Sequence, residues 1–281
     1  FTDSGLAQNI PAVDYFIEAV GPMGTIPSIS NQDGRSTPWC PPLTPALSAT
    51  SWCAGNQTMI NLAWTVPAGA SGLVAGYALD EGIGVRANDI SGGNNLGTLT
   101  NGPTWTTGKN GSALSFDGVD DYIATPLKPS SSFTWSAWIK VKSFSGYKSI
   151  ITASGGTYML MDVTSNAASF WSPDGLGGST LGITGLSLNT WYHITFVREG
   201  NSVTNGYKAY LNGSLRGQAN TGVWSSSDVI WIGGRNAATQ HFNGSLDDVR
   251  IYNRALTQTE IQTDMAVSAG TAPLVTSYTI K

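Results

Sequence analysis

The sequence predicts an all-β sandwich that carries one short helix. Only 11% of the residues are charged and 34 of the 281 are glycine, which suits strands joined by tight turns. Apolar and polar residues alternate along many short segments, as half-buried strands require. A single helix is expected at Gln258–Met265, because Thr257 and Glu260 form a capping box at its start.

The clearest alternation lies in Phe133–Val141. Its odd-numbered apolar side chains share one face of a strand, and Trp138 lies on the other. The dipeptide Asn212–Gly213 predicts a type I′ hairpin between the strands at 207–211 and 214–216, because that turn needs positive φ at both central residues. Further strands are expected at 150–151, 158–161, 191–197, 230–232 and 249–251.

Composition also excludes some functions. A net charge of −4 and a pI near 5.0 argue against nucleic-acid binding, which needs a basic surface. No apolar run approaches the roughly 18–20 residues of a membrane span. The chain begins at Phe1 with neither an initiator Met nor a signal-peptide pattern, which predicts a fragment or a processed product.

Several motifs follow one another in an order found in one family. They are an opening strand with a glycine-asparagine loop, a Ser-Phe-Asp-Gly segment, two core strands, a hairpin, and a closing strand that leads into the helix: Tyr77–Gly97, Ala113–Ile123, Phe133–Val141, Trp191–Val197, Tyr207–Arg216 and Gly244–Ile261. The region resembles the laminin-G-like (concanavalin-A-like) jelly-roll domains of secreted bacterial proteins. This resemblance implies a jelly-roll β-sandwich over residues 70–268 and an extracellular or cell-surface location.

The flanks resemble pieces of a fibronectin type III sandwich. Residues 1–42 are similar to its late strands followed by a Pro-rich linker, and residues 43–69 to its early strands, with Trp64 as the core tryptophan. Residues 269–281 are similar to its third strand. The resemblance implies that the jelly roll is inserted into a fibronectin-like sandwich.

Three arrangements of these flanking strands stay open. They belong to consecutive repeats cut at arbitrary points, they complete one sandwich within the chain, or one chain's tail completes the next chain's head. We expect Tyr15–Val20 to be sandwiched with Ile60–Val66 and Tyr278–Ile280, because unpaired sheet edges are templates for pairing.

The two cysteines, Cys40 and Cys53, each follow a tryptophan and have no histidine nearby in sequence. Two thiols cannot form a zinc site alone. We expect a disulfide, worth about 3 kcal/mol in the chain-entropy model, and an oxidising compartment. Two free cysteines are the alternative.

A catalytic role is not expected. Glucanases that share this fold carry a Glu-x-Asp-x-x-Glu strand, which sets two carboxyl groups on one face, and this sequence has no such strand. Adjacent Asp247 and Asp248 are predicted to point to opposite faces of a strand. His193 lies in an apolar alternating strand and is interpreted as a core histidine or a satisfied surface histidine.

A structural calcium ion is implied by the family resemblance. Calcium binds six to eight oxygens from carboxylates and backbone carbonyls. By resemblance, Asp247 in the closing strand, the carbonyl of Gly118 and Asp89 would supply ligands. In the alternative interpretation, Asp89, Asp117 and Asp121 only cap turns through their own side chains.

The expected function is non-catalytic binding or adhesion, with a glycan or the extracellular matrix as partner. Sugar rings stack on exposed aromatic faces flanked by polar groups, so Trp171 with Asp174, Trp224 and His241 are the candidate ligand-binding residues. Trp171 has an alternative role, in which it ends a strand and packs inward. Two further functions stay open: a fibre subunit that joins copies of itself head to tail by sharing strands, and an accessory domain of a secreted glycan-active enzyme.

Overall fold

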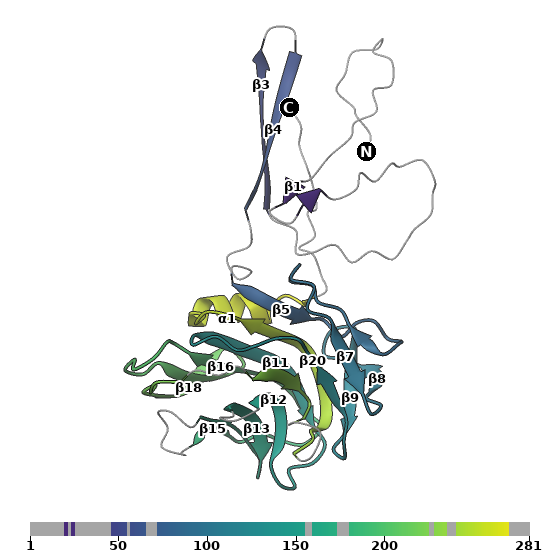
Figure 1. Cartoon of the computed structure of the whole chain (residues 1–281), viewed down its shortest axis with the longest axis vertical. Helices are drawn as coiled ribbons and strands as arrows, with labels where there is room; N and C mark the ends of the chain where they lie inside the picture. The colour runs from purple at the N-terminus through teal and green to yellow at the C-terminus, as the bar shows by residue number, and fades with distance from the viewer. Residues whose placement is uncertain are drawn as a thin grey trace. The chain divides into compact units, whose positions relative to one another are not determined.

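A computed structural model describes residues 20–21, 24–25, 46–54, 57–65, 72–154, 159–172, 180–224, 228–234 and 240–269. Over residues 72–269 the chain folds into two antiparallel sheets with one short helix (Figure 1). The predicted all-β sandwich is therefore confirmed.

The first sheet has the strand order β15-β14-β13-β12-β19-β10-β7-β6. Its strands are β6 (Arg86–Ala87), β7 (Gly97–Thr100), β10 (Tyr122–Ala124), β12 (Lys148–Ser154), β13 (Met159–Thr164), β14 (Ala167–Trp171), β15 (Thr180–Thr184) and β19 (Val229–Ile232). One row of paired residues faces the core across five of these strands: Ile123, Ile232, Ile151, Met161 and Phe170.

The second sheet has the order β18-β17-β16-β11-β20-β9-β8, and β5 also pairs with β20. Its strands are β5 (Leu73–Tyr77), β8 (Thr104–Thr107), β9 (Ser112–Asp117), β11 (Phe133–Val141), β16 (Trp191–Arg198), β17 (Tyr207–Leu211), β18 (Ser214–Ala219) and β20 (Asn243–Tyr252). Because β5 pairs with β20, the first and last strands of the sandwich are neighbours.

Aromatic side chains join the two sheets. On β11 Phe133, Trp135 and the other odd-numbered apolar residues are buried, as predicted. On the opposite face Thr134 and Ser136 are also buried, and Trp138 is half-buried. The rings of Phe133 and Trp135 stack with centroids 4.5 Å apart, and Phe170 of the other sheet lies edge-on to Trp135 at 6.1 Å. These contacts place Trp135 at the centre of the core.

The helix α1 (Gln258–Met265) begins and ends at the predicted residues. Its capping box is present, since the Thr257 side chain accepts from the Glu260 amide and the Glu260 carboxylate accepts from the Thr257 amide. Ile261 packs on the outer side of the second sheet, against Val197 and Tyr252 among others. Figure 1 shows α1 (yellow) beside β5 and β20.

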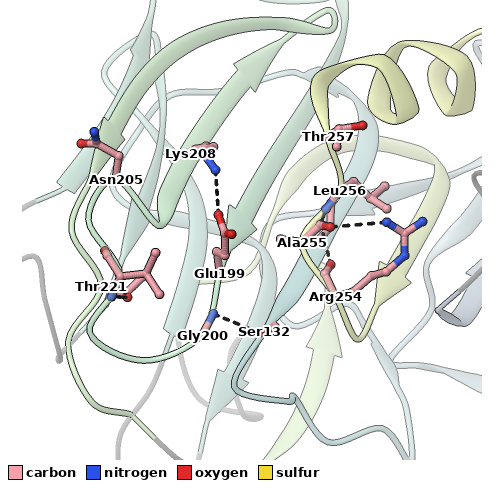
Figure 2. Close-up of polar contacts among 12 residues, drawn as sticks. Ser132, Glu199, Gly200, Asn205, Lys208, Thr221, Arg254, Ala255, Leu256 and Thr257 are labelled. Carbon is pink, nitrogen blue, oxygen red and sulfur yellow. Dashed lines mark hydrogen bonds and ion pairs between the residues drawn. The ribbon is translucent and has the colours of Figure 1, made fainter.

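The predicted hairpin is also confirmed. Asn212 and Gly213 have φ of 49° and 72°, as a type I′ turn requires, and they join β17 to β18. The loop before β17 is held at two points that Figure 2 shows: Lys208 donates to Glu199 at 2.9 Å, and the Gly200 amide donates to Ser132 Oγ at 3.0 Å.

The flanks contain two small sheets. β3 (Ala46–Ala54) pairs with β4 (Gln57–Thr65), at the place where two early strands were predicted. β1 (Val20–Gly21) pairs with β2 (Gly24–Thr25). The expected sandwich of Tyr15–Val20 with Ile60–Val66 and Tyr278–Ile280 stays a prediction, because Tyr15–Ala19 and Tyr278–Ile280 lie outside the described residues.

Several predictions fall on residues outside the described ranges. These include Tyr15–Ala19, Val66, Tyr278–Ile280 and Cys40. In the backbone pairing, Cys53 lies opposite Thr58. The Cys40–Cys53 disulfide therefore stays a prediction.

Candidate functional site

A polar hollow of about 430 Å³ lies at one end of the sandwich. It forms where the β7–β8 turn, the end of β9, the residue after β11 and the start of β20 meet. Its lining offers amide, hydroxyl, carboxylate and ammonium groups. The lining residues are Asn101, Gly102, Thr104, Ser115, Phe116, Asp117, Asp121, Lys142 and Asn243.

Hydrogen bonds hold the polar groups of the hollow in place. Asn243 Nδ2 donates to the Asp117 carbonyl at 3.0 Å, and Asn101 Nδ2 donates to the Asp120 carbonyl at 3.0 Å. Lys142 Nζ donates to Ser115 Oγ at 2.9 Å. Three segments distant in sequence are thus tied to β9 or to the turn that follows it, so the hollow is organised before any ligand arrives.

The turn between β9 and β10 is capped by its own carboxylates. Asp117 Oδ1 accepts from the Val119 amide at 2.7 Å, and Asp121 Oδ2 accepts from the Asp117 amide at 2.9 Å. Gly118, at φ 82°, supplies the left-handed conformation that the turn needs. Asp117 and Asp121 therefore cap the turn with their side chains, as the alternative interpretation has them do.

The same turn gathers three carboxyl groups. Oxygens of Asp117, Asp120 and Asp121 all lie within 4.8 Å of one another, close enough to share one cation. Asp121 is buried, and desolvation raises the pKa of its carboxyl group, with the charges of Asp117 and Asp120 adding to the rise. We refer to residues 117–121 as the acidic turn. A bound cation would relieve its mutual repulsion.

A second acidic cluster lies on β20. Asp248 has φ 47° at a bulge in the pairing of β20 with β11. Asp247 Oδ2 accepts from the amides of Lys109 and Asn110 at 2.7 and 2.9 Å, and Asp248 Oδ2 accepts from Asn110 Nδ2 at 2.7 Å. The prediction that these neighbours point to opposite faces is wrong, because the bulge lets both carboxyl groups reach one residue.

Asp247 is fully buried and incompletely bonded. Its Oδ1 has no hydrogen-bond partner in the structure. The pKa of Asp247 is raised to about 7, chiefly because burial desolvates the carboxyl group; the two amide hydrogen bonds oppose this rise, and the charges of Asp248 and Asp80 contribute to it. Near neutral pH this carboxyl group is therefore poised between its acid and its anion.

The three residues predicted to bind calcium lie at three different places. Asp89 accepts from the amides of Gly76, Ser91 and Asn95, so its carboxylate holds the loop after β6. The Gly118 carbonyl lies in the acidic turn and accepts from Lys148 Nζ at 3.2 Å. Asp247 lies four residues along β20 from Asn243, which contacts Gly118, and that span is about 13 Å. The structure does not bring them together.

Two of the predicted sugar-stacking residues are buried. Trp224 is 4% exposed, with its ring between Phe133 and the Arg198 guanidinium, and His241 is 3% exposed beside Tyr122. Neither offers a ring face to solvent, which corrects the prediction. The sequence did not indicate their burial, because the turn-rich segments that contain them have no alternation of apolar and polar residues.

The structure describes one of the other two candidate ligand-binding residues, Trp171, but not Asp174. Trp171 is half-buried and is the last residue of β14, as the alternative interpretation proposed, but it does not pack inward, because its neighbour Phe170 faces the core. Asp174 lies outside the described residues. His193 is buried on the outer face of the second sheet, where it contacts Trp138, and desolvation lowers its pKa to about 3, so the imidazole is neutral.

The two facing antiparallel sheets and the closing helix define a concanavalin-A-like sandwich. Residues 117–262, just over half of the chain, match the Laminin_G_3 family model, described as the Concanavalin A-like lectin/glucanases superfamily. The chain belongs to this family. The match begins at the acidic turn and includes neither flank, so the fibronectin type III assignment gains no support from it.

Solved structures share the fold at low identity. Domain 4 of AbnA, an extracellular arabinanase of Geobacillus stearothermophilus solved with arabinotriose, is 22% identical, with a TM-score of 0.54 over 69% of this chain and 98% of that one. The binding domain of Paraclostridial Mosquitocidal Protein 1 is 16% identical, with a TM-score of 0.56 over 70% of this chain and 52% of that one. The botulinum neurotoxin type G receptor-binding domain is 15% identical, with a TM-score of 0.52 over 69% and 51%.

These likenesses establish the fold. The chain resembles carbohydrate-binding and receptor-binding domains of secreted proteins, some of which are parts of enzymes. It spans about half of each toxin chain. No curated protein matches the sequence. Within the described residues, no helix has the length and apolar character to cross a membrane.

Proposed function

We propose that this chain is a non-catalytic, extracellular glycan-binding module whose ligand site is the polar hollow. One observation carries the proposal: amide, hydroxyl, carboxylate and ammonium groups line one hollow and are fixed by hydrogen bonds between distant segments. Sugar hydroxyls donate and accept at once, so a wall that offers both kinds of partner suits them. Domain 4 of AbnA, which shares this fold, was solved in complex with arabinotriose, and this supports a sugar as the ligand class.

The carboxyl groups of the hollow suit binding better than hydrolysis. Glycoside hydrolysis needs an acid and a second carboxylate on either side of the scissile bond, about 5 Å apart or more. Asp117 and Asp121 are close enough in distance, but they lie side by side on one turn and each accepts a hydrogen bond from a backbone amide of that turn. They cannot flank a sugar from two sides.

Calcium would have a structural role in this proposal. The acidic turn supplies three carboxylates to one point and lies in the wall of the hollow, so an ion there would stabilise the wall. The ion would bind in the turn that contains Gly118, which is one of the three predicted ligands. Asp89 and Asp247, the other two predicted ligands, would not take part.

The hollow can be tested with matched substitutions. A glycan array should identify a ligand, and titration calorimetry should then show that Lys142→Met and Thr104→Val each weaken binding about tenfold, the loss of one good polar contact. Lys128→Met and Thr107→Val remove equally exposed groups outside the hollow and should leave the affinity unchanged. An array with no bound glycan, or equal losses in all four variants, would contradict the proposal.

A structural role in a fibre is the second candidate. Among the described residues β3 and β4 pair only with each other, and a two-stranded sheet is marginal alone. Sharing strands between chains would complete it, whether or not the partner strands are fibronectin-like. Electron microscopy of the full chain should then show polymers, and removal of residues 1–36 should leave a folded sandwich that no longer assembles. A monodisperse monomer at high concentration would contradict this candidate.

A further inference from the structure

The end of the sandwich that carries the hollow also exposes large apolar side chains. Ile83, Val85, Val119 and Tyr147 are 80%, 67%, 71% and 55% exposed, and they are four of the eight large exposed apolar residues in the described part of the chain. Single exposed apolar residues are common, but several around one hollow indicate an interaction surface.

Strand pairing places these residues around the hollow. Arg86 pairs with Thr98 on β7, and the Leu99 amide donates to the Val85 carbonyl, so the loop with Ile83 runs alongside β7 toward Asn101. Asn101 in turn bonds the Asp120 carbonyl in the acidic turn.

The other two residues belong to the acidic turn and to the loop that contacts it. Val119 lies in the turn itself. Tyr147 precedes Lys148, whose Nζ reaches the Gly118 carbonyl. We call Ile83, Val85, Val119 and Tyr147 the apolar rim.

The loop of Ile83 and Val85 is held in its exposed position. Gly82 and Gly84 take positive φ of 66° and 88° on either side of Ile83. The Trp105 indole donates to the Gly84 carbonyl at 3.1 Å, and Glu81 accepts from the Asn88 amide at 2.6 Å. The exposure is therefore built by hydrogen bonds across the loop.

The described sandwich begins at the other end of β20. The Gly72 carbonyl accepts from the Asn253 amide, whereas the hollow includes Asn243. The ten residues of β20 span about 30 Å, so the rim lies at the far end from the point where the chain enters the sandwich.

Charge does not dominate this end. The carboxylates of Asp117, Asp120 and Asp121 are offset by the cationic side chains of Arg86, Lys142 and Lys148 on the neighbouring segments. Attraction to anionic lipid needs an excess of Lys and Arg, which this end lacks. Contact here would depend on burial of the rim, and its strength would scale with the apolar area buried.

We propose that this end of the molecule docks on membranes that display glycolipids. The hollow takes the headgroup sugar while the apolar rim enters the outer leaflet. A soluble glycan would leave the rim in water, whereas a glycan linked to lipid gives both the polar hollow and the apolar rim a partner. This inference rests on the proposed glycan-binding function and names its ligand class.

Vesicle flotation tests the inference with the full chain. Phosphatidylcholine vesicles alone are compared with vesicles that also carry a mixed glycosphingolipid fraction, and soluble glycans are titrated in parallel. We expect the glycolipid vesicles to be bound more tightly, and Ile83→Ser and Val85→Ser each to lower vesicle binding about tenfold with soluble-glycan affinity unchanged, because neither residue lines the hollow. Val223→Ser is the matched control. Val223 is 76% exposed, and it lies in the loop beside Asn201, at the end of the sandwich opposite to the hollow.

The outcomes separate this inference from the proposed function. Binding of soluble glycans without binding of vesicles overturns the membrane inference and leaves the glycan-binding proposal standing. Vesicle binding that glycolipid does not strengthen, or that Val223→Ser weakens as much as the rim variants, also overturns it. Rim variants that weaken soluble-glycan binding as much as vesicle binding would show that the rim contacts the glycan itself, and this would also overturn the membrane inference. Absence of both kinds of binding would overturn both proposals.

Discussion

The acidic turn and the Asp247 cluster contain the same chemistry in opposite surroundings. In the acidic turn, Asp117 and Asp120 are exposed and their carboxylates are solvated, with only Asp121 buried. On β20, both Asp247 and Asp248 are buried, and they hold the turn that contains Lys109 and Asn110. Water can screen the repulsion in the first cluster but not in the second.

This difference assigns different tasks to the two clusters. Exposed carboxylates on a tight turn are free to take a cation or a ligand hydroxyl. A buried carboxyl group that accepts from two backbone amides is a structural element, and its charge is costly there. The contrast predicts that pH and substitution act strongly on Asp247, whereas calcium acts on the acidic turn.

The largest expected effect is a dependence of stability on pH. The pKa of Asp247 is about 7 in the folded protein against 3.8 ordinarily, so between these values the folded state holds a proton that the unfolded state has lost. Stability from this group is therefore greatest at low pH, falls as the pH rises through this window, and levels off above it. The two pKa values correspond to at most on the order of 4 kcal/mol.

Urea denaturation at pH 5 and pH 8, with chelator present, measures this dependence. The wild type should lose stability between the two conditions, and Asp247→Asn, which keeps the shape but cannot ionise, should lose much less. Parallel curves for the two proteins would show that Asp247 is already ionised when folded.

Removal of the carboxyl group should have the next largest effect. Asp247→Ala leaves the amides of Lys109 and Asn110 without acceptors in a buried site, at a cost of about 3 kcal/mol. Asp120→Ala in the acidic turn should stay within about 0.5 kcal/mol, because no buried donor depends on that side chain. Denaturant midpoints at pH 5 compare the two, and equal losses would break the contrast between the clusters.

Local patterns in the sequence predicted the strands and the helix well. The alternation in Phe133–Val141, the Asn212–Gly213 turn and the capping box of Thr257 with Glu260 each act within a few residues, and each appears in the structure where expected. The physical reason is that backbone geometry and side-chain direction within a strand or turn are set by near neighbours.

The site depends on contacts that no local pattern records. The bulge at Asp248 arises from unequal residue counts between β20 and β11, which the sequence of either strand does not show. Asn101, Lys142 and Asn243 come from three separate segments and meet only after folding. To find these residues from the sequence, one would need to know which strands pair and in which register. The Ser-Phe-Asp-Gly motif that ends in Gly118 indicates only the turn.

Calcium should discriminate between the two clusters. An ion that binds only the folded state stabilises it, by about 2.7 kcal/mol when free calcium is one hundred times its dissociation constant. We expect millimolar calcium to raise the melting temperature relative to chelator in the wild type and in Asp247→Asn. Loss of the calcium effect in Asp247→Asn would instead restore the ligand set implied by the family resemblance, and an unchanged wild-type melting curve would exclude a stabilising ion.

The smallest predicted effect concerns repulsion within the acidic turn. Without calcium, three carboxylates within 4.8 Å repel one another, so Asp120→Asn should raise stability in chelator by a few tenths of a kcal/mol, as for other exposed like-charge neighbours. The same substitution removes a ligand and should reduce the stabilisation by calcium. Thermal melts of the wild type and of Asp120→Asn, each with chelator and with calcium, give the four melting temperatures that this comparison needs. A variant that is less stable than the wild type in chelator would mean that Asp120 carries a structural bond, and the acidic turn would then resemble the Asp247 cluster after all.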